Sequence, residues 1–262
     1  MSLAIYGKGG IGKTTIACNV ASVLGSLEKK VIVLGCDPKR DSARLICGSR
    51  IPALLDVYDS WDSISDFEQS GLIRTGNYGV KVVEVGGPRP GVGCAGKGLM
   101  LALGFLRSKN MFEGTDVAIF DILGDVVCGG FAVPVTHRFV DRVALVISGE
   151  FSSLFAANNI LKGMKALGAG VVGLVLNNRG GTENQHTSWR FAEKVGLEVI
   201  GEIPFSDALS RADGLLQTID KAETSNVVFA FQNLAQRLVS SPVSTSYTPL
   251  DDEGIYMDIG RR

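Results

Sequence analysis

The sequence has few of the features that mark nucleic-acid-binding, membrane or secreted proteins. Its net charge is −1 and its aromatic content is 7%, so neither general basicity nor a stacking surface favours nucleic acid. No apolar run reaches the roughly 18–20 residues that cross a bilayer. The start, MSLAIYGKGG, lacks the basic and apolar parts of a signal peptide. We therefore expect a cytoplasmic protein with no nucleic-acid or membrane partner.

Cysteines are also scarce, and their odd number, five, argues against a disulfide framework in a cytoplasmic chain. Three of them, Cys18, Cys36 and Cys47, lie in apolar settings, where a thiol behaves as a small buried hydrophobe. We expect those three in the core. Cys94 and Cys128 are flanked by glycines instead, which is poor material for a core, so we expect a ligand there.

What the chain does have is an alternation of short apolar runs and helical patterns. This rhythm predicts an α/β fold with a mostly parallel sheet flanked by helices. In such folds, ligands bind at the carboxyl ends of the strands. The expected strands are 3–6, 31–35, 82–85, 117–120, 143–148, 171–177 and 198–203, and the expected helices are 13–26, 97–109, 153–167, 187–195 and 226–239.

The chain of 262 residues, 45% of them hydrophobic, is long enough for one large domain with a sizeable core. We assign 1–240 to an ATPase and iron–sulfur reductase domain, on the motifs described below. The remaining 241–262 are rich in Ser, Thr, Pro and Asp and are expected to form an extended tail. Either a plain surface segment or an arm that contacts a partner fits this composition.

A phosphate-binding loop follows the first expected strand. The stretch GKGGIGKT fits the pattern G-x-x-x-x-G-K-[ST] between a strand and a helix, where backbone N–H groups and the helix N-terminus surround phosphate oxygens. Lys13 is expected to reach the β- and γ-phosphates, and the Thr14 hydroxyl to bind Mg²⁺. The expected nucleotide-binding residues here are Gly7, Lys8, Gly9, Gly10, Ile11, Gly12, Lys13, Thr14 and Thr15.

Carboxylates close two further strands on the same side of the predicted sheet. Asp37, just past the second strand, is placed to orient the attacking water or a Mg²⁺-bound water, and Asp41 to hold the outer shell of the metal. Asp121 ends the strand VAIFD and is expected to bind Mg²⁺ directly or through water. Gly124 then allows a loop to move when the γ-phosphate leaves. Together with the phosphate loop, these aspartates predict a nucleotide hydrolase.

The glycine-flanked cysteines indicate a metal cluster. Glycine lets free backbone N–H groups approach sulfur, and such hydrogen bonds tune the potential of an iron–sulfur cluster. One chain offers two such thiols, Cys94 and Cys128, whereas a cubane takes four. A two-fold homodimer that shares one 4Fe-4S cluster resolves the difference. Zinc with the same ligands stays chemically open, although the neighbouring nucleotide site favours redox.

The motifs YGKGGIGKTT, GCDPKRDS, GGPRPGVGCAGKG, DILGDVVCGGF and FAANNI resemble the nitrogenase iron protein family. The resemblance runs from residue 3 to about residue 213. The family comprises the reductase components of nitrogenase and of relatives that act on chlorophyll precursors, a nickel tetrapyrrole or carbon–sulfur compounds. It implies a homodimer with MgATP or MgADP in each subunit and one bridging 4Fe-4S cluster. Electrons arrive from a ferredoxin or flavodoxin and pass singly to a two-subunit nitrogenase-like catalytic protein.

Carried over by motif, the resemblance gives roles to individual residues of this chain. Lysine at position 8 marks the deviant class of phosphate loops, in which it reaches the nucleotide of the facing subunit. Lys97 stands where nitrogenase reductases carry an arginine that some organisms ADP-ribosylate, and lysine lacks the planar fork of that arginine. The implied nucleotide and switch residues are Lys8, Lys13, Thr14, Asp37, Lys39, Asp41, Asp121 and Asp125, of which Lys8, Asp37 and Asp125 act in catalysis. Asn177 contacts adenine, the stretch from Pro204 to Arg211 forms a nucleotide-side loop, and Cys94 and Cys128 hold the cluster.

Two other classes of protein use the same deviant loop. A partition or division-site ATPase positions cargo and needs no pair of glycine-flanked cysteines, and membrane-binding members often end in a basic amphipathic helix. A cluster-assembly ATPase uses bridging cysteines but hands the cluster on. Retention of the cluster by the purified protein separates the reductase from both alternatives.

Overall fold

The computed structural model describes residues 1–63, 67–87, 95–122, 132–178, 185–207, 209 and 225–260. Its described strands form one sheet in the order β3-β4-β2-β5-β1-β6-β7-β8, in which β3 alone runs antiparallel to its neighbour. The strands are β1 (Ser2–Gly7), β2 (Val31–Gly35), β3 (Ile73–Thr75), β4 (Lys81–Glu84), β5 (Val117–Asp121), β6 (Arg142–Ile147), β7 (Val171–Asn177) and β8 (Val199–Ile203).

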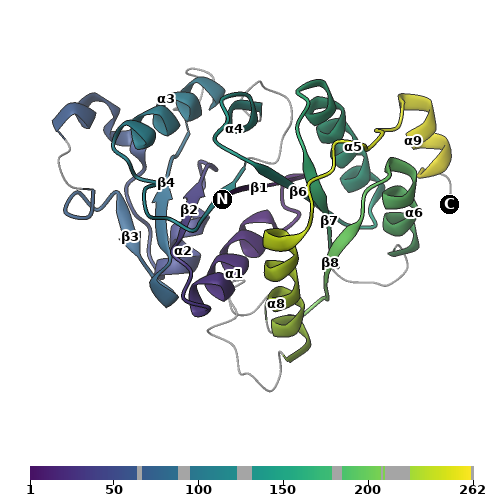
Figure 1. The fold of residues 1–262 in the computed structure, drawn as a ribbon, viewed down its shortest axis with the longest axis horizontal. Helices are drawn as coiled ribbons and strands as arrows, with labels where there is room; N and C mark the ends of the chain where they lie inside the picture. The colour runs from purple at the N-terminus through teal and green to yellow at the C-terminus, as the bar shows by residue number, and fades with distance from the viewer. Residues whose placement is uncertain are drawn as a thin grey trace.

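Helices cover both faces of this sheet, as Figure 1 shows. The α-helices are α1 (Lys13–Ser26), α2 (Asp41–Cys47), α3 (Ala95–Ser108), α4 (Val133–Thr136), α5 (Phe151–Ala166), α6 (Gln185–Val195), α8 (Ser225–Ser240) and α9 (Asp252–Asp258), with 3₁₀ turns at Leu54–Ser63 and Asn77–Gly79. One core lies between the sheet and α1, α2 and α8. The other lies between the sheet and α3, α5 and α6.

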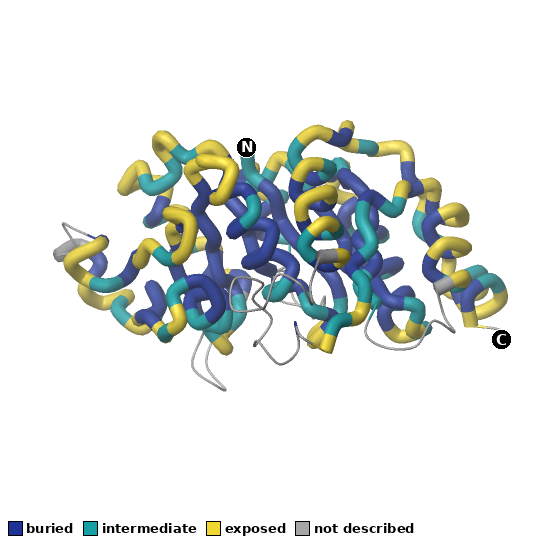
Figure 2. Tube along the Cα trace, turned by 90° about the horizontal axis from the view of Figure 1, so that it is seen from below, coloured by how far each residue is buried: buried dark blue, intermediate teal, exposed yellow. Residues whose placement is uncertain are grey.

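The expected α/β fold with a mostly parallel sheet is confirmed, and each expected strand and helix has a counterpart. The strands are recognisable because both of their faces are covered, which makes them continuously apolar. Figure 2 shows this as buried positions concentrated along the centre of the molecule. The sequence reading missed the antiparallel edge strand β3 and the short helices α2, α4 and α9, whose few residues carry little periodicity.

The C-terminal segment packs against the chain's own body. Ser244 pairs with Val171 beside the start of β7, and the buried Tyr247 hydroxyl donates to the Ala169 carbonyl over 2.9 Å. Asn158 on α5 bonds both backbone groups of Leu250 at 2.8 Å. The expectation of an extended tail is wrong for Asp252–Asp258, which form α9 with a capping hydrogen bond at the first turn.

Within the described ranges, no helix combines the length and the apolar character needed to cross a membrane.

Candidate nucleotide and magnesium site

The phosphate loop joins β1 to α1 at the carboxyl edge of the sheet, and two of its glycines are required there. Gly7 ends β1 with φ 145°, and a Cβ on it would stand 2.5 Å from the Val146 carbonyl oxygen. Gly12 precedes α1 with φ 100°, and its Cβ would stand 2.5 Å from Asn177 Nδ2. Positive φ angles and close neighbours both disfavour larger residues at these two positions, so the loop needs glycine there.

The two lysines of the loop point to different places. Lys13 is 7% exposed, and its Nζ donates to the Lys8 carbonyl over 3.2 Å. Lys8 Nζ instead donates to Ser152 Oγ over 2.9 Å and lies 3.8 Å from the Glu150 carboxylate at the start of α5. Lys13 therefore lines the inside of the loop, while Lys8 contacts the start of α5 in the same chain.

Asp121 is a buried carboxylate beside the loop. It ends β5 at 2% exposure, and burial raises its pKa to about 6, with the Thr14 hydroxyl and the Lys13 charge opposing the rise. Ser42 Oγ donates to Asp121 Oδ2 over 3.1 Å. A carboxylate and the Thr14 hydroxyl are oxygen ligands of the kind that Mg²⁺ takes, and the neighbouring Lys13 carries the charge that pairs with phosphate. The residues present therefore fit a magnesium–nucleotide complex.

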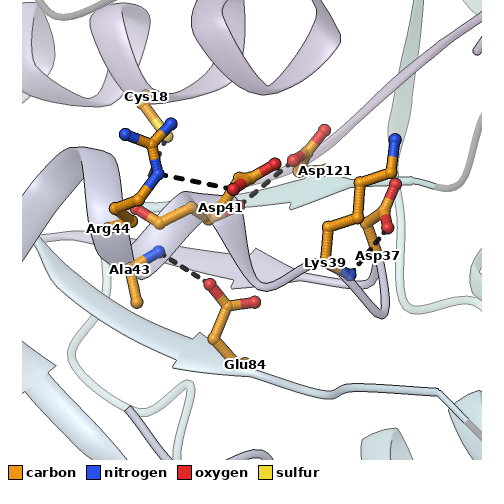
Figure 3. A network of polar contacts seen from close by, with 9 residues as sticks. Cys18, Asp37, Lys39, Asp41, Ala43, Arg44, Glu84 and Asp121 are labelled. Atoms are coloured by element: carbon orange, nitrogen blue, oxygen red, sulfur yellow. Dashed lines mark hydrogen bonds and ion pairs between the residues drawn. The ribbon is translucent and has the colours of Figure 1, made fainter. Parts of the chain in front are cut away.

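The segment between β2 and α2 holds the other expected carboxylates (Figure 3). Asp37 Oδ1 accepts the Lys39 N–H over 2.9 Å, which closes a local turn. Asp41 is the first residue of α2 and lies 3.4 Å from Arg44. The first turn of α2 is bonded to the sheet, because the Ala43 N–H donates to Glu84 Oε1 over 2.7 Å. Asp37 and Asp41 thus stand on one short segment beside Asp121.

A cavity of about 290 Å³ opens on the other side of the phosphate loop. Asn177, at the end of β7, lies in its wall and donates from Nδ2 to the Ile11 carbonyl over 2.7 Å. Pro204 and Phe205, just after β8, line the same cavity. An apolar wall with an amide at its edge is suitable for a flat heterocycle such as adenine.

The structure brings most of the predicted site residues to one edge of the sheet. Asp125, Cys94, Cys128 and Arg211 lie outside the described residues, as does Gly124. Among the described residues, no cluster of three or more His, Cys, Asp or Glu could hold a metal ion. Cys18 and Cys36 are buried as expected, and burial raises their pKa, whereas Cys47 is only partly buried.

The sequence reading missed four residues that contact the site. Ser42 donates a hydrogen bond to Asp121, and Glu84 accepts one from the first turn of α2. Glu150 and Ser152 both contact Lys8. Glu84 had a signal in the sequence, because a single charged residue interrupts the apolar run VVEV. The other three are polar residues in loops or in a first helical turn, and only the fold brings them to the site.

The sheet order, the phosphate loop and the neighbouring carboxylates define the fold of a phosphate-loop NTPase of the deviant-loop class. Solved structures with this fold include the MinD cell division protein of Aquifex aeolicus, with a TM-score of 0.68, 21% identity and coverage of 93% of this chain and 98% of that chain. The cell division ATPase MinD of Pyrococcus furiosus matches with a TM-score of 0.67, 20% identity and coverage of 91% and 98%. At these identities the likeness shows the fold alone.

The family follows from sequence comparison. The profile of the 4Fe-4S iron sulfur cluster binding proteins of the NifH/frxC family matches residues 1–259. "Nitrogenase iron protein 2" of Methanothermobacter thermautotrophicus is 42% identical over 253 residues, which cover 96% of this chain and 94% of the relative. "Nitrogenase iron protein 2" of Methanobacterium ivanovii is 43% identical over 241 residues, covering 91% and 90%. The chain belongs to the NifH/frxC family of 4Fe-4S cluster-binding proteins.

Proposed function

We propose that this chain is an ATP-dependent 4Fe-4S reductase that passes low-potential electrons, one at a time, to a separate nitrogenase-like catalytic protein. Full-length membership of a cluster-binding family supports the cluster, and relatives named nitrogenase iron protein support the reductase role. In this proposal a homodimer shares one cluster between two copies of Cys94 and Cys128. A ferredoxin or flavodoxin supplies the electrons.

The observation that carries the proposal is the register of three neighbouring strands. Gly35, the last residue of β2, is paired with Glu84 of β4 on one side and with Asp121 of β5 on the other. The chain reaches Cys94 soon after β4 and Cys128 soon after β5. The ends of β4 and β5, the strands that precede the two thiols in the sequence, therefore lie on either side of β2, at the edge that holds the phosphate loop.

The residues of this edge would divide the work on a bound nucleotide. The backbone N–H groups of the phosphate loop and Lys13 bind the phosphates, and Thr14 with Asp121 holds the metal. Asp37 orients the attacking water, and Lys8 compensates the charge that develops on the phosphates of the facing subunit. Bound MgATP supplies the free energy that the electron transfer uses. Asp125 and Lys39 complete the switch segments.

The test is anaerobic purification followed by iron analysis and nucleotide binding. The intact protein is expected to be brown and to contain about four irons per dimer. Cys94→Ser and Cys128→Ser are expected to lose the iron and to keep MgATP affinity, because neither thiol belongs to the phosphate loop. Cys18→Ser is the control, since Cys18 is a buried free thiol of α1 to which the proposal gives no part in the cluster.

An iron-free, colourless protein after anaerobic reconstitution would refute the proposal, as would loss of iron from Cys18→Ser alone. A cluster that leaves the protein during gel filtration with chelator indicates cluster assembly rather than electron transfer. Asp121→Asn is expected to abolish ATP-driven electron delivery while the cluster stays, because the metal ligand is lost. Unchanged delivery by that variant would contradict the role given to Asp121.

A further inference from the structure

Glu84 is a buried carboxyl group with no part in the roles given so far. It is the last residue of β4 and is 0% exposed. Its Oε1 accepts the Ala43 N–H, whereas its Oε2 is buried without a hydrogen-bond partner in the described part of the chain. An apolar residue would be cheaper to bury at the end of a strand. What a glutamate provides here, and an apolar residue would not, is an acceptor for the Ala43 N–H.

Glu84 accepts a hydrogen bond from the start of α2. The first N–H groups of a helix have no partner within the helix, and Arg40, which precedes α2, makes no side-chain capping bond. Glu84 provides that bond to Ala43 from the neighbouring strand, over 2.7 Å. The segment Asp37–Asp41 lies directly before this turn, so the position of its carboxylates depends on a residue of β4.

The space around Gly35 shows how closely these groups are packed. A Cβ on Gly35 would collide with Glu84 Oε2 and would stand 3.0 Å from Ser42 Oγ. Ser42 Oγ in turn donates to Asp121 Oδ2 over 3.1 Å. The first turn of α2 is thus bonded to β4 through Glu84 and to β5 through Asp121, and the missing side chain of Gly35 makes room for both contacts.

We propose that Glu84 is a positioning residue of the nucleotide site, which fixes the Asp37–Asp41 segment against β4, the strand that leads on to Cys94. One consequence of this role, an effect of hydrolysis on the strand that leads to Cys94, rests on the proposed function. In the proposed reductase, a movement of Asp37–Asp41 on hydrolysis is transmitted through Glu84 to the end of β4, the strand that precedes Cys94 in the sequence.

The experiment compares Glu84→Ala and Glu84→Gln in the anaerobically prepared full-length protein. Hydrogen exchange is followed in the peptide that contains α2, and kcat for ATP hydrolysis is measured together with MgADP affinity. Loss of the capping acceptor in Glu84→Ala is expected to speed exchange of the Ala43 amide about tenfold. We expect kcat to fall about tenfold and MgADP affinity to change less than about twofold, because Asp37 acts at the γ-phosphate. Glutamine keeps an acceptor oxygen and is expected to restore both.

Val82→Ala is the matched control for general loss of stability. Val82 lies two residues before Glu84 on β4, so its side chain is on the same face of the sheet. It belongs to the same core as Ala43, Leu45 and Ile46. This variant is expected to unfold more easily. The ratio of its kcat to its MgADP affinity is expected to be that of the unaltered protein. Hydrogen exchange in α2 is expected to keep its rate relative to exchange in β1.

Two results would overturn the proposal. One is an unchanged α2 exchange rate in Glu84→Ala. The other is a loss of kcat that is matched by an equal loss of MgADP affinity, in Glu84→Ala as well as in Val82→Ala. The iron content of the same samples separates this question from the proposed function. Iron-free protein with fast α2 exchange in Glu84→Ala refutes the reductase and supports the role of Glu84. Full iron with unchanged exchange refutes the role of Glu84 alone.

Discussion

The titration of Glu84 makes a prediction about stability that needs neither nucleotide nor partner. Burial raises its pKa from 4.5 to about 7, against the opposing effect of the Ala43 N–H, and the Asp121 charge adds to the rise. A carboxyl whose pKa is raised on folding favours the neutral form in the folded state. The free energy of unfolding therefore falls as pH rises from the unfolded pKa to the folded pKa, and this contribution is constant beyond it.

The magnitude follows from the size of the shift. Each pKa unit corresponds to about 1.4 kcal/mol, so the rise from 4.5 to about 7 is equivalent to about 3 kcal/mol between low and high pH. Glu84→Gln removes the titration and keeps the acceptor for Ala43. The difference in unfolding free energy between the two proteins is expected to change by about 2–3 kcal/mol from about pH 5 to about pH 8, with the variant gaining as pH rises.

Urea unfolding of the nucleotide-free proteins at several pH values measures this difference, since other titrating groups, including Asp121, act in both proteins. Glu198→Gln is the control: the Glu198 side chain is 63% exposed and pairs with Arg237 at the surface, where such pairs contribute little. Its unfolding free energy is expected to change with pH in parallel with that of the unaltered protein. Parallel profiles for Glu84→Gln as well would refute the reasoning, because Glu84 would then have the same pKa folded and unfolded.

Two further substitutions test contacts of the site and of the tail. Lys8→Ala removes exposed contacts with Ser152 and Glu150, so thermal unfolding is expected within about 1 kcal/mol of the unaltered protein while ATP hydrolysis is lost; normal hydrolysis would contradict the role of Lys8. Asn158→Ala leaves both backbone groups of Leu250 without their partner and is expected to cost about 2 kcal/mol in urea unfolding. Limited proteolysis is expected to cleave its tail faster, and equal protection would contradict that account.

The sequence predicted those parts of the fold in which a local pattern and its tertiary setting agree. The central strands are apolar throughout because helices cover both faces of the sheet. The phosphate loop was equally clear, because its glycines are required by local backbone shape, as at Gly12 with φ 100°. Short elements gave no such pattern: α2 spans Asp41–Cys47, and its start depends on a capping residue from another strand.

The candidate site could be predicted where a motif names its residues, and not where the contact spans distant segments. Lys13 was expected at the start of the first helix and Asp121 at the end of a strand, and both lie there. The contact of Lys8 with Ser152 joins residues 144 positions apart, and only the pairing of β1 with β6 brings their segments together. The tail was expected to be extended because of its composition. Its packing depends instead on distant residues: Asn158 bonds Leu250, and the Ala169 carbonyl accepts a hydrogen bond from the Tyr247 hydroxyl.

A buried carboxyl at position 84 lowers stability at neutral pH, yet no apolar residue could take over its contact with α2. Methionine or leucine would avoid the cost of burying a charge, but the Ala43 N–H would then be buried without an acceptor. Glutamine would avoid both costs but would replace one oxygen beside Gly35 and Ser42 with an amide group. A glutamate instead keeps a second oxygen in the space left by the missing side chain of Gly35, and this oxygen has no hydrogen-bond partner in the described part of the chain.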